Sequence, residues 1–531
     1  MKQPGIALLA AASALVLALT GCSASSTGER ASGNGTLVFA TGEPDHLTPG
    51  RQTVAFDQVR SIFAPLVALD DKNDVTYVQA KSVTSDDAQH WTITLRDGWT
   101  FQNGEPVTAK SYVDAWNHTA YGPNAWENSG QLAGIQGYGD LNPAEGGTPT
   151  AETMSGLAVV DDLTFTVALT APDSQFPLQL GPGQTAFYPM PESAYTDLDA
   201  YDRKPVGNGP FEMTSAWKDN QEFTVEAYKD YAGAAPKVHA VTFRSYTDQA
   251  TGYTDVLAGN ADIIMLPTNK MTSASADFGD RLHSIQAPGV DFIGFPPADA
   301  RYQNPDVRKA ISMAIHRDAV NKAIYGGLYQ PATALTAPSM AGTPEDACGD
   351  SCTFDPTAAK TLLAKAGGFS GSMELVFPGG IGLDSLYEAY ANQIRQNLGI
   401  ADVTAKPSTD WAEYYDSLVA GTVQGPHFGH WGALYASQQN TLRALFTPTG
   451  NCQICTGYSN PAVDALLHQA DAAATLDDSY ALYAEAQKVI LADFPTVPTF
   501  SNTYSYVTSD RVKDLPAVSG TVIIPEVALQ G

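Results

Sequence analysis

The sequence is short of positive charge and of long apolar runs. It has 29 Lys and Arg against 57 Asp and Glu, which gives a formal net charge of -28. Nucleic-acid binding depends on clustered Lys and Arg that neutralise phosphates, so we expect no nucleic-acid partner. Behind the N-terminus, no apolar stretch is long enough to cross a bilayer as a helix. A chain of 531 residues exceeds what one hydrophobic core usually serves, so we expect two or three domains.

Common catalytic motifs are also missing. The chain has no Gly-x-Ser-x-Gly elbow, no His-Glu-x-x-His and no phosphate-binding loop. Gly181–Ala186 fits Gly-x-Gly-x-x-Ala, but the prolines in and after it are incompatible with the helix that this motif needs. We therefore expect no enzymatic activity and no cofactor, although carboxylate pairs formed in space are invisible in so acidic a sequence.

The N-terminus has the pattern of an export signal. Lys2 precedes an apolar stretch from Ile6 to Leu19, which is too short to span a membrane as a mature helix. Leu19-Thr-Gly-Cys22 follows and resembles the bacterial lipobox, in which the cysteine is acylated before cleavage. We interpret residues 1–21 as a lipoprotein signal peptide, Cys22 as the lipidation site and residues 22–35 as a flexible tether. The alternative is an ordinary secretory signal with a chance cysteine.

Four further cysteines stand in two close pairs. They are Cys348 with Cys352 and Cys452 with Cys455. An even number in an oxidising compartment favours two short-range disulfides. A four-thiolate zinc site is the alternative, and it would need the two loops to meet in space.

Local patterns predict mixed strands and helices. A cap residue followed by proline predicts three helix starts, at Asn304, Asp355 and Asn460. Thr108 is a further predicted N-cap. Alternation predicts strands at Thr36–Ala40, Trp91–Leu95 and Leu163–Leu169, and Asp97-Gly98 predicts a hairpin from the second of these into Trp99 and Phe101. The mixture indicates an α/β protein.

The most specific pattern in the chain is Trp91–Trp116, in which a strand, a turn, the link Gly104-Glu-Pro-Val-Thr108 and an aromatic helix follow one another. This pattern resembles one family, the oligopeptide/dipeptide/nickel-binding class of extracellular solute-binding proteins (family 5). Further landmarks follow in the family's order at residues 206–211, 256–263, 306–310 and 457–461.

The resemblance implies a bilobed periplasmic-binding-protein fold (type II, cluster C-like) with an extra subdomain on the first lobe. By position, lobe I takes residues 36–61, 205–290 and 499–531, its subdomain takes 62–204, and lobe II takes 291–498. It also implies a monomer outside the cytoplasm, anchored to the cell membrane by its N-terminal lipid. Its partners would be a small-molecule or peptide ligand and the permease subunits of an ABC importer.

The resemblance also implies a ligand-contacting segment. A family strand reads Trp-x-Ala-Asp-Tyr, and its Asp often pairs with a peptide's ammonium, because a buried ammonium is costly without a carboxylate. Here the segment is Trp431-Gly432-Ala433-Leu434-Tyr435, with Leu434 at the Asp position. This puts ordinary free-amine peptides in doubt, unless a carboxylate such as Glu43 or Asp45 substitutes from across the cleft. A core role for Leu434, with the register shifted, is the alternative.

Other assignments remain open. Asn208 stands where the family has Thr and is a candidate ligand contact or only part of a turn. His427 and His430 suggest a metal site, but residues three apart on a strand point to opposite faces, so we expect two ordinary histidines and no metal. The ligand is expected to be an oligopeptide or peptide-like compound. Alternatives are an oligosaccharide or other uncharged solute, a metal chelate, a ligand-sensing receptor role or an extracellular hydrolase.

Overall fold

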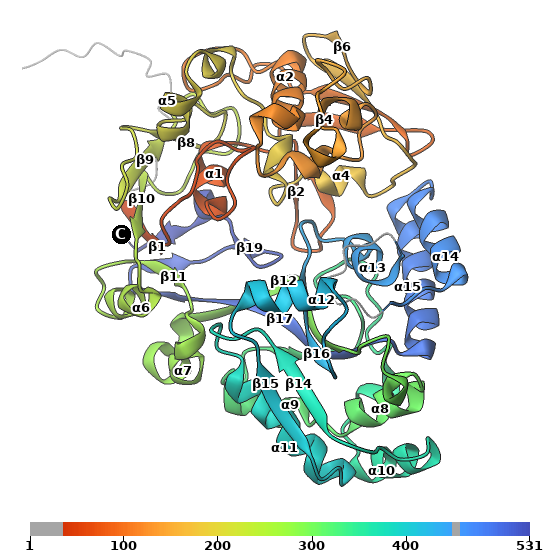
Figure 1. Cartoon of the computed structure of the whole chain (residues 1–531). Helices are drawn as coiled ribbons and strands as arrows, with labels where there is room; N and C mark the ends of the chain where they lie inside the picture. Colours follow the sequence, from red (N-terminus) through yellow and green to blue (C-terminus); the bar gives the residue numbers. More distant parts are fainter. Residues whose placement is uncertain (1–34, 449–456, 531) are drawn as a thin grey trace, which may run out of the picture. The chain divides into compact units, whose positions relative to one another are not determined.

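One large mixed sheet organises the chain, seen here in a computed structural model that describes residues 35–448 and 457–530 (Figure 1). Its strands lie in the order β15 (Val403–Pro407), β14 (Met373–Phe377), β16 (His427–Gly432), β12 (Leu282–Gly294), β17 (Val497–Thr508), β11 (Ile263–Met265), β1 (Thr36–Thr41), β10 (Ala240–Ser245), β9 (Phe223–Ala227) and β8 (Phe211–Met213), and β13 (Gln330–Pro331) also pairs with β17. The strand predicted at residue 36 is confirmed as β1.

Strands β12 and β17 join the two halves of this sheet. They are 13 and 12 residues long and pair antiparallel from Leu282 opposite Val507 to Ile293 opposite Val497. At one end β17 pairs with β11, and at the other end β12 pairs with β16. The strands at the two edges therefore come from different parts of the sequence, and two crossing strands connect them.

A second, four-stranded sheet belongs to the region between β3 and β8. Its order is β4 (Ala80–Thr84), β5 (His90–Leu95), β7 (Thr164–Ala168) and β6 (Leu157–Asp161). Helix α2 (Ala109–Ala120) packs against it, and its N-cap Thr108 and Ser111 form the two bonds of a capping box. The hairpin predicted after β5 is wrong: β5 pairs with β4 and β7, and the chain after Asp97-Gly98 makes a short loop that buries Trp99 and Phe101.

The predicted helices of the second half are confirmed. The side chains of Asn304, Asp355 and Asn460 each accept a backbone N–H in the first turn. These caps start α8 (Pro305–Met313), α10 (Pro356–Lys365) and α14 (Pro461–Asp471). Other helices here are α9 (Arg317–Ile324), α11 (Asp384–Leu398), α12 (Trp411–Val419), α13 (Gln438–Phe446) and α15 (Leu476–Asp493).

Smaller elements complete the described part of the chain. The helices are α1 (Phe56–Ile62), α3 (Tyr138–Leu141), α4 (Phe176–Gln179), α5 (Leu198–Arg203), α6 (Gln249–Leu257) and α7 (Met271–Phe278). The strands are β2 (Val67–Leu69), β3 (Val75–Tyr77), β18 (Val512–Asp514), β19 (Ala517–Val518), β20 (Thr521–Val522) and β21 (Ala528–Leu529). In residues 35–448 and 457–530, no helix is both long and apolar enough for a membrane span.

Two large hydrophobic cores lie on the two sides of the crossing strands. One contains Trp116 and Phe165, in edge contact with centroids 5.4 Å apart, and is built mainly from residues before 244. The other contains Tyr387 and Tyr390 and is built mainly from residues after 252. Separate cores agree with more than one domain, as expected from the chain length.

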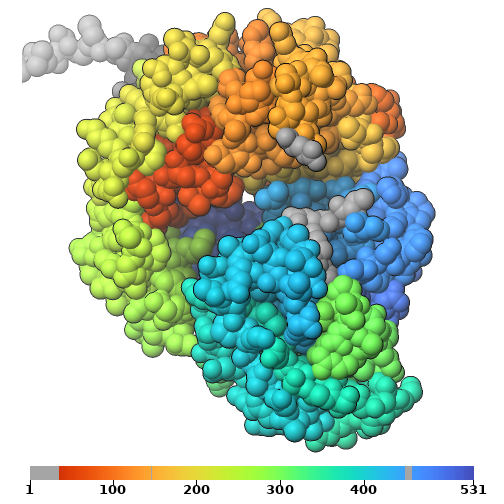
Figure 2. All heavy atoms as spheres, in the orientation of Figure 1, coloured from red at the N-terminus to blue at the C-terminus, as the bar shows by residue number. Residues whose placement is uncertain are grey.

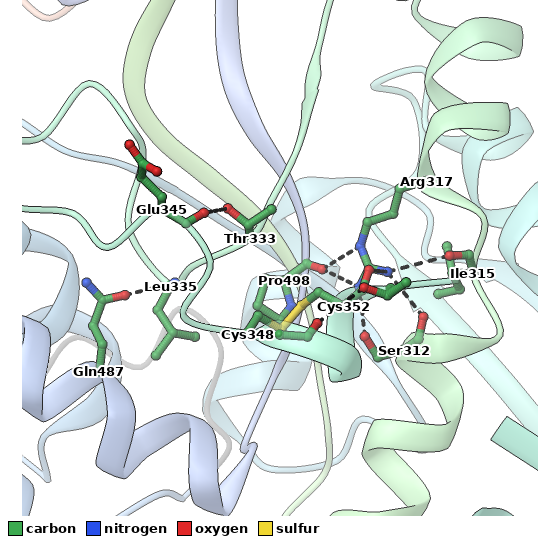
Figure 3. Close-up of a disulfide and its surroundings, with 12 residues drawn as sticks. Ser312, Ile315, Arg317, Thr333, Leu335, Glu345, Cys348, Cys352, Gln487 and Pro498 are labelled. Atoms are coloured by element: carbon green, nitrogen blue, oxygen red, sulfur yellow. Dashed lines mark hydrogen bonds between the residues drawn. A yellow bond between two sulfur atoms is a disulfide. The ribbon is translucent and has the colours of Figure 1, made fainter. Parts of the chain in front are cut away.

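A disulfide and a buried arginine brace the second core (Figure 3). Cys348 and Cys352 are joined, with Cα atoms 5.6 Å apart. Arg317 donates to the carbonyls of Cys352 at 3.1 Å and Pro498 at 3.0 Å, which ties the disulfide loop to β17. Burial lowers the pKa of Arg317 to about 10. Bonded sulfurs are not thiolates, so this pair is removed from the zinc alternative; Cys452 and Cys455, like Cys22, lie outside the described residues.

Candidate ligand site

The segment with the family-like motif links β16 to α13. β16 lies antiparallel to β12, with His430 opposite Asp291 and Trp431 opposite Val290. The backbone N–H of Ala433 then donates to Pro288 at 2.8 Å, and Ser437 caps α13. The motif is therefore attached directly to one of the two crossing strands (Figure 1).

Trp431 and Tyr435 line the same open pocket. It has a volume of about 330 Å³ and is lined by Trp431, Tyr435, Gln439, Asn440, Arg443, Ala444 and Thr447. The Trp431 indole donates to Asn440 at 2.9 Å, and the Tyr435 hydroxyl donates to Gln439 at 2.6 Å. Polar side chains of α13 thus hold both rings, and both residues are half-buried, an arrangement suited to stacking on a ligand.

Leu434 is on the surface. It is 46% exposed, so a core role does not account for it. Gly432 is exposed as well, and Ala433 is half-buried. A Cβ at Gly183 would lie 2.2 Å from the Leu434 carbonyl oxygen, so glycine is needed at that position for the 62–204 region to approach the motif this closely. The adjoining surfaces of the two regions can be followed in Figure 2.

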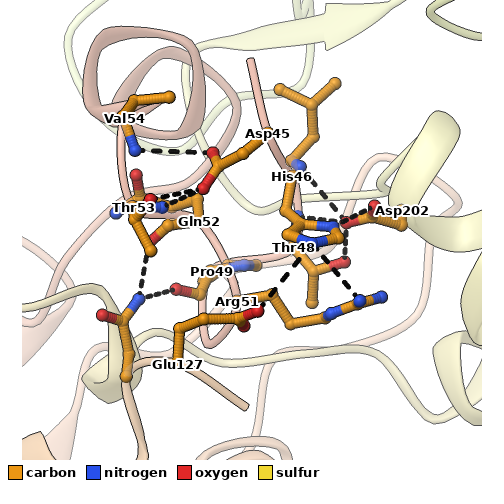
Figure 4. A network of polar contacts seen from close by, with 12 residues as sticks. Asp45, His46, Thr48, Pro49, Arg51, Gln52, Thr53, Val54, Glu127 and Asp202 are labelled. Atoms are coloured by element: carbon orange, nitrogen blue, oxygen red, sulfur yellow. Dashed lines mark hydrogen bonds and ion pairs between the residues drawn. The ribbon is translucent and has the colours of Figure 1, made fainter.

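Glu43 and Asp45 are occupied by other partners. Glu43 accepts from the Trp217 indole at 3.1 Å and from the Asn220 backbone at 2.8 Å. Asp45 accepts from the backbone and hydroxyl of Thr53 at 2.7 and 2.6 Å (Figure 4). Burial acts to raise the pKa of Asp45, but the hydrogen bonds outweigh it and lower the pKa. Among the described residues, no hydrogen bond or ion pair joins either carboxylate to residues 431–435.

Asn208 has a structural role. Its side chain is fully buried, accepts from the Ala64 N–H at 3.0 Å and donates to Gln79 at 2.7 Å. The structure therefore does not expose this side chain to a ligand.

The two histidines of β16 have different surroundings. His427 is buried, with Nδ1 3.2 Å from the Gly425 carbonyl. His430 faces its neighbour strand, and its Nδ1 lies 2.7 Å from Asp291. No group of three or more His, Cys, Asp or Glu in the described ranges is arranged to hold a metal ion.

The pairing of His430 with Asp291 (the His430–Asp291 pair) was not foreseen. Asp291 interrupts the apolar run from Val290 to Phe295, and a charge at such a place is the signal that could have marked it. Burial acts to lower the pKa of His430, but the hydrogen bond and charge of Asp291 outweigh it and raise the pKa. Beside the pair, Asn502 of β17 is buried, and its Oδ1 has no hydrogen-bond partner within the described residues.

A buried polar network lies at the other end of the motif. It consists of Asp173, Gln175, Ser437, Gln439 and Asp471 and is called the Gln439 cluster below. Gln439 donates to Asp173 at 2.8 Å and Asp471 at 2.9 Å, and Ser437 donates to Gln175 at 2.8 Å. Asp471 also pairs with Arg443 and accepts from Tyr483. The cluster joins the 62–204 region to α13, α14 and α15, and sequence reasoning did not find it.

Known proteins agree with this architecture. The family described as bacterial extracellular solute-binding proteins, family 5 Middle, matches residues 74–453. The periplasmic murein peptide-binding protein MppA of Escherichia coli (strain K12) is 26% identical over 89% of both chains. The oligopeptide-binding protein OppA of Bacillus subtilis (strain 168) is 26% identical over 89% of this chain and 88% of its own.

A solved structure supports the fold in the same way. MppA, a periplasmic murein tripeptide-binding protein, in its unliganded open form superposes with a TM-score of 0.82, at 24% identity, over 93% of this chain and 97% of that one. The expected α/β bilobed periplasmic-binding-protein fold is thereby confirmed, and so is the family resemblance.

Proposed function

Because the chain belongs to family 5 of the bacterial extracellular solute-binding proteins, we propose that it captures a peptide or peptide-like compound between two lobes and delivers it to an ABC importer. The observation that carries this proposal is the placement of Trp431 and Tyr435, which share an open pocket next to the crossing strand β12. Ligand would shift an equilibrium between open and closed lobes, by as much as its affinity differs between them.

The proposed lobes follow the sequence boundaries given above. In support, β14, β15 and β16 all fall within 291–498, and β1 and β8–β11 fall within 36–61 and 205–290. The four-stranded sheet falls within 62–204, the proposed subdomain.

Ligand contacts are proposed for Trp431, Gly432, Ala433, Leu434 and Tyr435. An exposed leucine cannot neutralise an ammonium, so the ligand's amine is blocked, absent or placed elsewhere. We do not extend the proposal to Asn208, and Glu43 would first have to exchange its bonds to Trp217 and Asn220.

The protein is proposed to act outside the cytoplasm, held to the membrane by lipid on Cys22. Replacing Cys22 with Ala should release it into the medium without changing ligand affinity. Fractionation of cells followed by immunoblotting checks this, and retention of the variant on the membrane would refute the lipid anchor.

A non-peptide solute is the second candidate for the ligand. The exposed Leu434, in place of the family's Asp, favours it, because an uncharged and partly apolar compound tolerates that side chain better than an ammonium does.

Native mass spectrometry of the protein purified without refolding tests both candidates. Release of co-purified molecules should give a ladder of masses that differ by amino-acid residues. A single non-peptide mass would instead favour the second candidate and would overturn the peptide proposal while leaving transport intact.

A further inference from the structure

The His430–Asp291 pair is set up to present one nitrogen outward. Asp291 lies 2.7 Å from Nδ1, so the carboxylate holds a proton on that nitrogen. The His430 side chain is 40% exposed, whereas that of Asp291 is only 17% exposed. Phe428, on the same face of β16, lies parallel to the imidazole with ring centroids 6.4 Å apart.

The other ring nitrogen, Nε2, is without a hydrogen-bond partner in the described part of the chain. Gly432 leaves its surroundings open: a Cβ there would lie 3.6 Å from Nε2 and would meet no other atom within 4 Å. Since Gly432 is not among the residues with positive φ, the chain does not need glycine there for its backbone conformation.

We propose that His430 is the polar anchor of the ligand and donates its Nε2 proton to a carbonyl or carboxylate oxygen of the bound peptide. Asp291 is a positioning residue that holds the imidazole by Nδ1. This inference rests on the proposed function and names the ligand chemistry accepted at β16 next to the motif. His430 does not line the pocket of Trp431 and Tyr435, because adjacent side chains of a strand point to opposite faces. Anchoring by His430 also gives a reason for Leu434. If the peptide places an oxygen next to the imidazolium, no carboxylate is needed at residue 434 to bind an ammonium.

The groups around His430 support donation rather than acceptance. Asp291 of β12 is its one charged neighbour in the described structure, Asn502 of β17 is neutral, and Phe428 is apolar. Burial raises the pKa values of Tyr329 and Tyr504, and the charge of Asp291 acts in the same direction, so both hydroxyls remain neutral. The imidazolium therefore stays paired with Asp291 and exposes an N–H, which repels a ligand ammonium and attracts an oxygen.

The test uses the full mature chain and a tryptic digest of casein as the probe. Equilibrium dialysis and mass spectrometry measure which peptides are retained by the wild type and by His430→Phe. The phenyl ring keeps the contact with Phe428 but has no N–H. Gly432→Ala, which places a methyl group in van der Waals contact with Nε2, at 3.6 Å, without removing charge, is the second variant. His90→Phe is the matched control, because His90 forms a similar pair with Asp87 at 2.8 Å on β5.

We expect His430→Phe to weaken retention roughly tenfold or more, as loss of a charge-assisted hydrogen bond does, and His90→Phe to leave it unchanged. Gly432→Ala should weaken it less. Acetylating the peptide amines should not weaken retention. Methyl esterification distinguishes the two oxygens: it abolishes retention if a carboxylate is bound and spares it if a carbonyl is bound.

Other outcomes overturn the inference. If His430→Phe retains the digest like the wild type, or if acetylation abolishes retention, the anchor is not His430 while the peptide-binding function stands. If the wild type retains no peptide at all, the proposed function fails and the inference fails with it.

A pH comparison provides a readout that a structural role would not affect. Binding by the wild type should weaken as pH rises through the raised pKa of His430, because the imidazolium then loses its proton, and His430→Phe should remove that dependence. An unchanged pH dependence in the variant would contradict donation by His430.

Discussion

Polar side chains at the two ends of residues 427–439 differ in their burial and in their hydrogen bonding. In the Gln439 cluster the Asp471 side chain is 6% exposed, and its oxygens are taken up by Gln439, Tyr483 and Arg443. In the His430–Asp291 pair the histidine side chain is 40% exposed, and one nitrogen is open. Buried, mutually satisfied groups hold elements together, whereas an exposed group with an open atom can be satisfied by a ligand. The first region should thus respond in stability and the second in binding.

The strongest test of this contrast is Asp471→Ala. It removes one acceptor from Gln439 and the carboxylate partner of Tyr483 and Arg443, so the free energy of unfolding should fall by about 3 kcal/mol. Urea denaturation followed by tryptophan fluorescence measures it. Glu388→Ala, at an exposed position of α11, is the control and should change stability by no more than about 0.5 kcal/mol. Equal changes in the free energy of unfolding for the two variants would show that the cluster does not stabilise the fold.

Gln175→Ala should have a smaller effect of the same kind. Gln175 is fully buried, accepts from Ser437 at 2.8 Å and donates to Ser479 at 2.8 Å, so its loss leaves two hydroxyls short of a partner. We expect unfolding to become easier by roughly 1–2 kcal/mol, measured by thermal denaturation. The exposed Gln221, changed to Ala, should behave like the wild type; a stable Gln175 variant would mean that the bonds between the two regions contribute little.

Asp291→Asn should have a small effect on the free energy of unfolding and a larger effect on the pKa of His430. A partly exposed pair contributes no more than about 1 kcal/mol, so the midpoint of denaturation should move little. The pKa of His430 should fall, because the amide cannot stabilise the imidazolium as the carboxylate does. NMR titration of the histidine ring protons, with His430→Phe to assign the signal, measures it. An unaltered titration would show that Asp291 does not hold the proton.

The smallest expected effect is the contribution of His430 to stability as pH changes. The pKa of His430 is raised in the folded protein. Its stabilising contribution is therefore complete below the unfolded value of about 6.5 and is lost as pH rises through the folded value. The difference in melting temperature between wild type and His430→Phe should shrink over that range. A difference that grows with pH would reverse the sign of the shift.

Local features were predictable where neighbouring residues decide them. Caps followed by proline at residues 304, 355 and 460 start helices because their partners lie within one turn. The hairpin after β5 failed because the partner of a strand can lie far along the chain: Ile93 pairs with Phe165 instead. The motif at Trp431 was visible from the family pattern. The hydrogen bonds that Glu43 and Asp45 accept from other residues were not.

The sequence by itself determined the family, the α/β composition, the helix starts and the absence of an Asp at residue 434. These depend on short patterns and on their order. Only the tertiary structure decided that His430 meets Asp291, 139 residues away, and that Gln439 meets Asp173, 266 residues away. The physical reason is that strand register and the approach of separate regions place such side chains together, and neither is encoded by the residues adjacent to them.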